Sequence, residues 1–187
     1  VDTYRLLAKT LIEQGDFSGA TQLFQRVLCA DPNDYIAHAG LSVVYREGDV
    51  LSQALWHLER AFEIEPYNSA IQQELRVLYI EFSEQKLKQK RGDAKGNEIP
   101  DSLPLTQGAL ARLYIQGELY VQAIDVLRGA LAEDGDRIDL EVLLAEALWR
   151  DHQRMAAVQI CLQALEKLPN CITANAILAE IWLQTGR

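Results

Sequence analysis

The feature that most constrains the fold of this chain is a pattern of apolar and small residues that recurs about every 34 residues. Its first copy runs from Tyr4 to Pro32 and places the following residues at helical spacing: Tyr4, Leu7, Ala8, Leu11, Ala20, Phe24 and Val27. Gly15-Asp16 separates the two halves of this copy, and Pro32 closes it. The pattern therefore predicts a helix, a turn and a second helix.

The same pattern returns downstream every 34 or 35 residues. The second copy contains Leu41, Ser42, Tyr45, Ala54, Leu58, Ala61 and Pro66. The fourth contains Leu110, Ala111, Tyr114, Ala123, Leu127 and Ala130; the fifth contains Leu144, Ala145, Leu148, Ala157, Cys161, Ala164 and Pro169; the sixth begins with Leu178, Ala179 and Trp182. Each unit is too small to bury its own apolar face, so we expect the units to stack on one another.

The third copy is incomplete. Leu75 and Tyr79 match the pattern, but Arg76 stands where a small residue belongs, and a second helix is not found. The residues that follow are rich in Lys, Gly and Pro. We predict a first helix extended to about Lys90 and then a charged, mobile loop over residues 91–102. The alternative is a plain linker between two separate pairs of repeats.

The pattern has an aromatic residue first, then Leu followed by a small residue, and later Ala-x3-Phe. In this order and at this spacing, the chain resembles the tetratricopeptide repeat. The resemblance covers about 170 of the 187 residues. It implies an all-α, right-handed superhelical solenoid of helix-turn-helix repeats with about ten helices. We expect N-terminal repeats over residues 1–79, an extended helix end and charged loop over 80–103, and C-terminal repeats over 104–187.

In the family that the chain resembles, the first helix of each repeat lines a concave groove with residues outside the packing signature. The resemblance implies a ligand-binding groove made by Arg5, Lys9, Ile12, Ile36, Ala39, Val43, Arg46, Gln73, Val77, Ile80, Gly108, Arg112, Ile115, Val142, Glu146, Trp149, Ala176, Glu180 and Leu183. Solvent-facing apolar residues at these sites indicate binding, with Trp149 as an aromatic anchor near Arg112 and Ile115. The alternative is that Trp149 and Ile115 pack against neighbouring repeats.

One subclass of the family binds the C-terminal carboxylates of chaperones with Lys, Arg and Asn residues on three successive first helices. Arg5 matches that set. The other positions hold Lys9, Gly40, Ala70 and Glu74, and the second half of the chain offers Gly108, Leu143, Thr173 and Ile177. The sequence therefore argues against a carboxylate clamp.

The charge and the hydropathy of the chain restrict its partners. A net charge of −9 and a pI of about 4.8 disfavour nucleic acids and anionic membranes. No apolar stretch approaches the ~20 residues that span a bilayer, and no signal segment opens the chain. We therefore expect a cytoplasmic protein, and, because the chain starts inside one repeat and stops inside another, a part of a larger one.

No residue pattern in the sequence indicates catalysis, so we expect neither an enzyme nor a cofactor nor a metal. The three histidines, His38, His57 and His152, occupy unrelated repeat positions and are interpreted as structural. Cys161 takes the place of Phe24 and is interpreted as core, and three cysteines without a CxxC argue against a disulfide framework.

Recognition of another protein is the function that remains. We expect a scaffold that binds a peptide or a helical segment of a partner in the groove. The alternative is a self-association module that forms a homodimer or a longer superhelix through its last helix.

Overall fold

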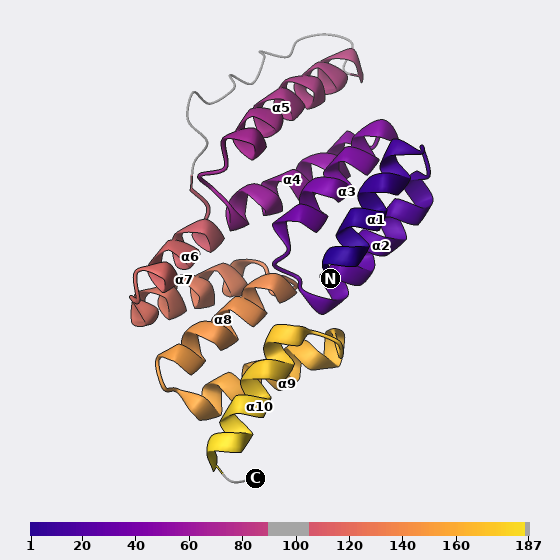
Figure 1. Cartoon of the computed structure of the whole chain (residues 1–187). Helices are drawn as coiled ribbons and strands as arrows, with labels where there is room; N and C mark the ends of the chain where they lie inside the picture. The colour runs from indigo at the N-terminus through magenta and orange to yellow at the C-terminus, as the bar shows by residue number, and fades with distance from the viewer. Residues whose placement is uncertain (90–104, 186–187) are drawn as a thin grey trace. The chain divides into compact units, whose positions relative to one another are not determined.

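Every regular element in the computed structural model is an α-helix within the residues that the structure describes, 1–89 and 105–185 (Figure 1). The helices are α1 (Asp2–Glu13), α2 (Phe17–Ala30), α3 (Tyr35–Glu47), α4 (Leu51–Ile64), α5 (Ser69–Gln89), α6 (Gln107–Gln116), α7 (Tyr120–Glu133), α8 (Ile138–Arg150), α9 (Arg154–Lys167) and α10 (Ile172–Thr185). The predictions of an all-α fold and of about ten helices are confirmed for these residues.

The helices form two compact units. The N-terminal unit contains α1, α3, α4, α5 and the first part of α2, and the C-terminal unit contains α6 to α10 together with residues 26–33. Helix α5 ends at Gln89, close to the predicted end of the extended helix. The predicted loop over residues 91–102 lies outside the described residues.

The turns between paired helices keep the period of the sequence. One residue in each turn has a positive φ: Gly15 at 78°, Asp49 at 58°, Glu118 at 59° and His152 at 62°. Gly48 lies one residue before the position that Gly15 occupies in the first repeat; it has an ordinary φ of −81°, and the next residue, Asp49, takes the left-handed conformation. The position, rather than the glycine, is what the repeat conserves along the chain.

Side-chain caps explain where α3, α5 and α6, each the first helix of its repeat, begin. The Asp34 carboxylate accepts a hydrogen bond from the Ala37 N–H at 2.9 Å, and the Thr106 hydroxyl accepts one from the Ala109 N–H at 3.2 Å. The Asn68 side-chain oxygen accepts from the first turn of α5 in the same way. These caps satisfy backbone donors that the helix itself leaves unpaired.

Small residues fill the helix crossings, as the pattern predicts. Ala8, Ala20, Ala54 and Ala123 are fully buried, and Cys161 is buried in the same way as Phe24. Gly40 shows why size matters: a Cβ atom built there would lie 2.2 Å from the Phe24 ring. Close approach of the backbones is what allows the large side chains to pack between them.

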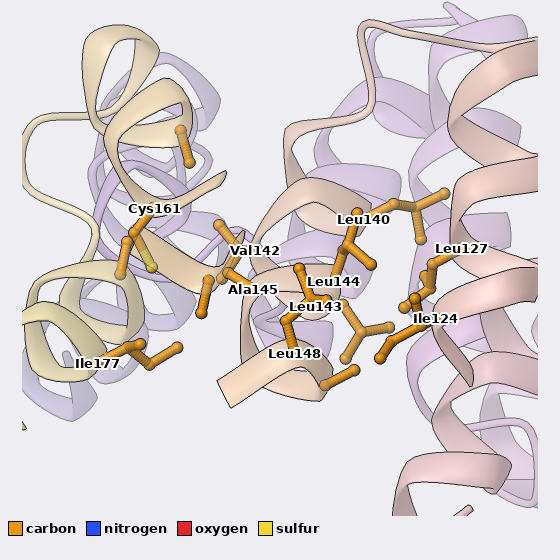
Figure 2. Close-up of a cluster of buried hydrophobic side chains, with 14 of the residues drawn as sticks. Ile124, Leu127, Leu140, Val142, Leu143, Leu144, Ala145, Leu148, Cys161 and Ile177 are labelled. Atoms are coloured by element: carbon orange, nitrogen blue, oxygen red, sulfur yellow. The ribbon is translucent and has the colours of Figure 1, made fainter. Parts of the chain in front are cut away.

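Helix α8 is the centre of the core of the C-terminal unit. Figure 2 shows Leu140, Leu144 and Leu148 on the side of α8 that faces Ile124 and Leu127 of α7. Figure 2 also shows Val142 on the side toward Cys161 of α9 and Ile177 of α10. A helix covered on two sides buries more of its surface than an amphipathic helix with one apolar stripe.

Candidate functional site

An open cleft lies between α3, α4 and α5 in the N-terminal unit. Its volume is about 190 Å³, and it is lined by Ala39, Ser42, Val43, Arg46, Leu58, Ala70, Ile71, Glu74 and Leu78. Leu58, Ile71 and Leu78 are buried and form an apolar floor. Val43, at the rim, remains 45% exposed.

Arg46 closes one end of this cleft with ion pairs between α3 and α5. Its Nε donates to Glu81 Oε2 at 2.9 Å, and its Nη2 donates to the other oxygen of the same carboxylate. Its Nη1 lies 3.3 Å from Glu74 Oε2. The hydrogen bond to Glu81 raises the pKa of Arg46 above its ordinary value, so the guanidinium stays charged. Bidentate geometry of this kind orients the planar guanidinium.

Three of the predicted groove residues, Ala39, Val43 and Arg46, therefore line a real cleft. The apolar residues Ile36, Val77 and Ile80 are each 37–41% exposed on α3 and α5, outside the lining of this cleft. Lys9 and Gln73 are exposed as well, and Ile12 is half-buried.

Arg5 has a structural role in the N-terminal unit. Its Nε donates to the Asp34 carboxylate at 2.7 Å, and its Nη1 donates to Asp2 at the same distance. Asp34 is itself buried and caps α3. Arg5 thus links α1 to the start of α3, and its guanidinium is engaged within the unit.

In the C-terminal unit, three predicted groove residues are buried: Gly108, Ile115 and Val142. The prediction that they face an open groove is wrong. Ile115 and Val142 belong to the hydrophobic core. For Val142 the reason is visible in Figure 2, because its side chain lies toward α9 and α10, which cover that side of α8.

Trp149 is half-buried and packs against the same core. Its remaining surface lines a shallow cleft of about 410 Å³ together with Tyr120, Arg150, His152, Arg154 and Gln184. Neither Arg112 nor Ile115 lines that cleft. Glu146, one turn before Trp149 on α8, forms an ion pair with Arg150 at 2.7 Å.

The other predicted groove residues of the C-terminal unit keep some exposed surface. Ala176 and Glu180 are exposed on α10, and Leu183 is 81% exposed. Arg112 is half-buried on α6. The described part of the C-terminal unit thus offers a shallow cleft beside Trp149 and exposed side chains on α10, whereas the N-terminal unit offers a cleft with an apolar floor.

A histidine and aromatic cluster on α3 and α4 was not predicted. His38 Nδ1 and His57 Nδ1 lie 3.0 Å apart, a hydrogen-bonding distance. Tyr45 stacks on His57 with a 5.4 Å centroid distance, and the Trp56 ring meets His57 edge-on at 4.8 Å. Burial, followed by the neighbouring His38, lowers the pKa of His57 to about 3. The two histidines are 19 residues apart, and only the facing of α3 and α4 brings them together.

Among the described residues, no group of three or more His, Cys, Asp or Glu side chains is arranged to hold a metal ion. Likewise, none of the helices in the described ranges is long and apolar enough to cross a membrane.

The 34-residue register of the sequence and the helix-turn-helix units of the structure define an all-α helical repeat protein, whose repeats resemble the tetratricopeptide repeat. No family model matches the chain, and no curated protein matches it.

Several solved structures resemble it at low identity. MamA is 17% identical, with 96% of this chain and 84% of that chain covered and a TM-score of 0.40. A tetratricopeptide repeat protein from Parabacteroides merdae is 18% identical, with coverage of 99% and 73% and a TM-score of 0.41. The TPR2AB domain of yeast Sti1 in complex with pHSP90 is 16% identical, with coverage of 97% and 70% and a TM-score of 0.42.

Proposed function

We propose that this chain is a non-catalytic, cytoplasmic interaction scaffold that binds a peptide or helical segment of a partner protein between α3 and α5. The observation that carries the proposal is the cleft itself. It has a buried apolar floor, an exposed valine at its rim and a fixed guanidinium at its end. Apolar surface left in contact with water in a concave site favours occupation by a ligand.

The binding free energy that such a cleft can supply is modest but sufficient to hold a peptide segment. An apolar side chain that fills the cleft gains about 25 cal/mol per Å² of buried surface, and the ordering of the ligand opposes part of this gain. Arg46, held by Glu81, supplies a rigid polar end that orients the ligand. Binding at this cleft therefore requires a ligand of complementary shape and charge, and it requires no reactive group.

The test compares two exposed apolar side chains of similar exposure. Val43 is 45% exposed at the cleft, and Leu162 is 49% exposed on α9, in the other unit. A partner is first isolated with the wild-type chain and identified, and its affinity is then measured by calorimetry for Val43→Ser and Leu162→Ser. We expect Val43→Ser to weaken binding at least tenfold, about 1.4 kcal/mol, and Leu162→Ser to leave it unchanged. Equal affinities for both variants would move the binding surface away from the cleft.

Self-association through α10 is the second candidate function. Leu183 is 81% exposed and Trp182 is 46% exposed at the end of this helix. Light scattering after gel filtration would detect a dimer, and Leu183→Ser would dissociate a dimer formed through this surface. A monomer at all concentrations would remove this candidate.

A further inference from the structure

The apolar cleft is followed, at Arg46, by a second cleft in the same unit. The second cleft has a volume of about 530 Å³ and is lined by Arg46, Glu47, Asp49, Leu51, Glu81, Glu84 and Gln85. Arg46 lines both clefts, and its ion pairs with Glu74 and Glu81 join their walls. The two clefts can therefore be contacted by one continuous ligand.

The charge of the combined surface is strongly negative. The two linings together contain five carboxylates and one guanidinium, and the carboxylates are Glu47, Asp49, Glu74, Glu81 and Glu84. The guanidinium of Arg46 is already engaged by Glu74 and Glu81. Glu47 and Glu84 are exposed at the rim. The surface thus attracts cations and repels anions.

We propose that the ligand of this site is a basic amphipathic segment of a partner protein, with an apolar side chain next to Lys or Arg residues. This inference rests on the proposed function and specifies its ligand. The apolar side chain enters the cleft over Leu58, Ile71 and Leu78, and the cationic side chains reach the carboxylates of α3 and α5. The carboxylates alone would not define a site. The adjoining apolar cleft supplies the binding surface, and the charge selects the occupant.

The charge of the chain supports this choice of occupant over a second copy. The chain carries a net charge of −9, so two copies repel each other as whole molecules and a cationic partner is attracted. A second copy still has to be tested as an occupant, because the sequence from Lys86 to Lys95 is locally basic.

The experiment uses the full chain and three fluorescein-labelled synthetic peptides of 15 residues. The first combines leucines on one helical face with lysines on the other, the second replaces the lysines by glutamates, and the third replaces the leucines by serines. Binding is followed by fluorescence anisotropy at about 0.05 M and about 0.5 M salt. We expect the leucine–lysine peptide to bind at least about tenfold more tightly than either control, with a large loss of affinity at high salt.

Matched variants separate the site from the general negative charge of the chain. Glu47→Gln/Glu84→Gln removes two carboxylates at the site, whereas Glu133→Gln/Glu166→Gln removes two exposed carboxylates on α7 and α9. We expect the first double variant to lower affinity for the leucine–lysine peptide by about fivefold or more and the second to change it by less than about twofold. Ala70→Phe fills the cleft from its exposed rim and should abolish binding.

The outcomes distinguish a wrong ligand from a wrong site. If Ala70→Phe blocks binding but both double variants behave alike, the cleft binds ligands and the inference of a basic ligand is overturned. If Ala70→Phe has no effect on any peptide, the proposed function at this cleft fails as well. If sedimentation shows a wild-type dimer that Ala70→Phe dissociates, the occupant is a second copy, and the inference is overturned in favour of self-association.

Discussion

At the scale of single residues, two glycines in helices should respond to alanine in opposite ways. At Gly40, in α3, a Cβ would meet the Phe24 ring at 2.2 Å, whereas at Gly129, in α7, its nearest neighbour would be a glutamine side-chain oxygen at 3.9 Å. We expect Gly40→Ala to lower the free energy of unfolding by about 1–3 kcal/mol through overpacking. Gly129→Ala should raise it by about 0.5–1 kcal/mol, because alanine favours the helix. Urea unfolding of both variants measures this; an unchanged or raised stability in Gly40→Ala would contradict the packing of Phe24 against Gly40, and a loss in Gly129→Ala would contradict the open space at that site.

The histidine pair predicts an acid-sensitive stability. The pKa of His57 is about 3 in the folded chain, against an ordinary value of 6.5. As the pH falls from about 6.5 toward 3, the unfolded chain therefore binds a proton at His57 that the folded chain does not, and stability decreases.

A variant without this titration should lose less stability in acid. His57→Phe keeps a ring beside Tyr45 and removes the ionisable group. Between pH 7 and pH 4, the free energy of unfolding should decrease more in the wild type than in the variant, by about 1 kcal/mol or more. Chemical unfolding at each pH measures this difference. Parallel losses in the two proteins would show that His57 is not held neutral by the fold.

At the scale of elements, the turns between paired helices carry local strain at identifiable positions. His152 has a φ of 62°, in the left-handed region that costs residues with a side chain roughly 1 kcal/mol or more. Gly15 occupies the same region in the first repeat with a φ of 78°. We expect His152→Gly to raise the free energy of unfolding by about 0.5–1 kcal/mol, the gain being reduced by the greater entropy of the unfolded chain.

The adjacent residue is the control for this turn. Gln153 has a φ of −80°, so Gln153→Gly removes no strain and should lower stability. The measurement is the Tm by calorimetry. A lower Tm for His152→Gly than for the wild type would mean that the His152 side chain contributes more than its conformation costs.

The helices could be predicted from the sequence because one register repeats along the chain, whereas the candidate site could be predicted only in part. Apart from Ile36, the predicted groove residues occupy three positions of the repeat. Residues at the middle position are unburied in every copy: Lys9, Val43, Val77, Arg112, Glu146 and Glu180. At about 100° per residue, Val43 is rotated about 100° from the buried Ser42, whereas Ala39 and Arg46 are only about 60° and 40° away.

This geometry explains which predictions failed. Val142 holds the position of Ala39, only about 60° from the buried Ala145, so the neighbouring repeat can cover it. Whether it does so depends on the packing of α10 against α8, which a single sequence does not reveal. For the same reason, the contact of His38 with His57 and the ion pairs of Arg46 depend on the facing of two helices and were not predicted.

At the scale of the whole molecule, the two units differ in how they use their repeats. The N-terminal unit contains the cleft between α3 and α5, with an apolar floor and an acidic extension. The C-terminal unit uses the equivalent positions of α6 and α8 partly for its own core, as Ile115 and Val142 show. Similar repeats in the sequence thus give unequal surfaces, and the proposed ligand binding is assigned to the N-terminal unit.

The measurement that tests this claim most directly is a nuclear magnetic resonance titration of the isotope-labelled full chain with the leucine–lysine peptide. A chain of 21.0 kDa is within reach of amide spectra. We expect the largest shifts at residues 39–49 of α3 and its turn and at residues 70–85 of α5, with little change in α9. Shifts concentrated in α9 or α10, with α3 and α5 unaffected, would contradict it.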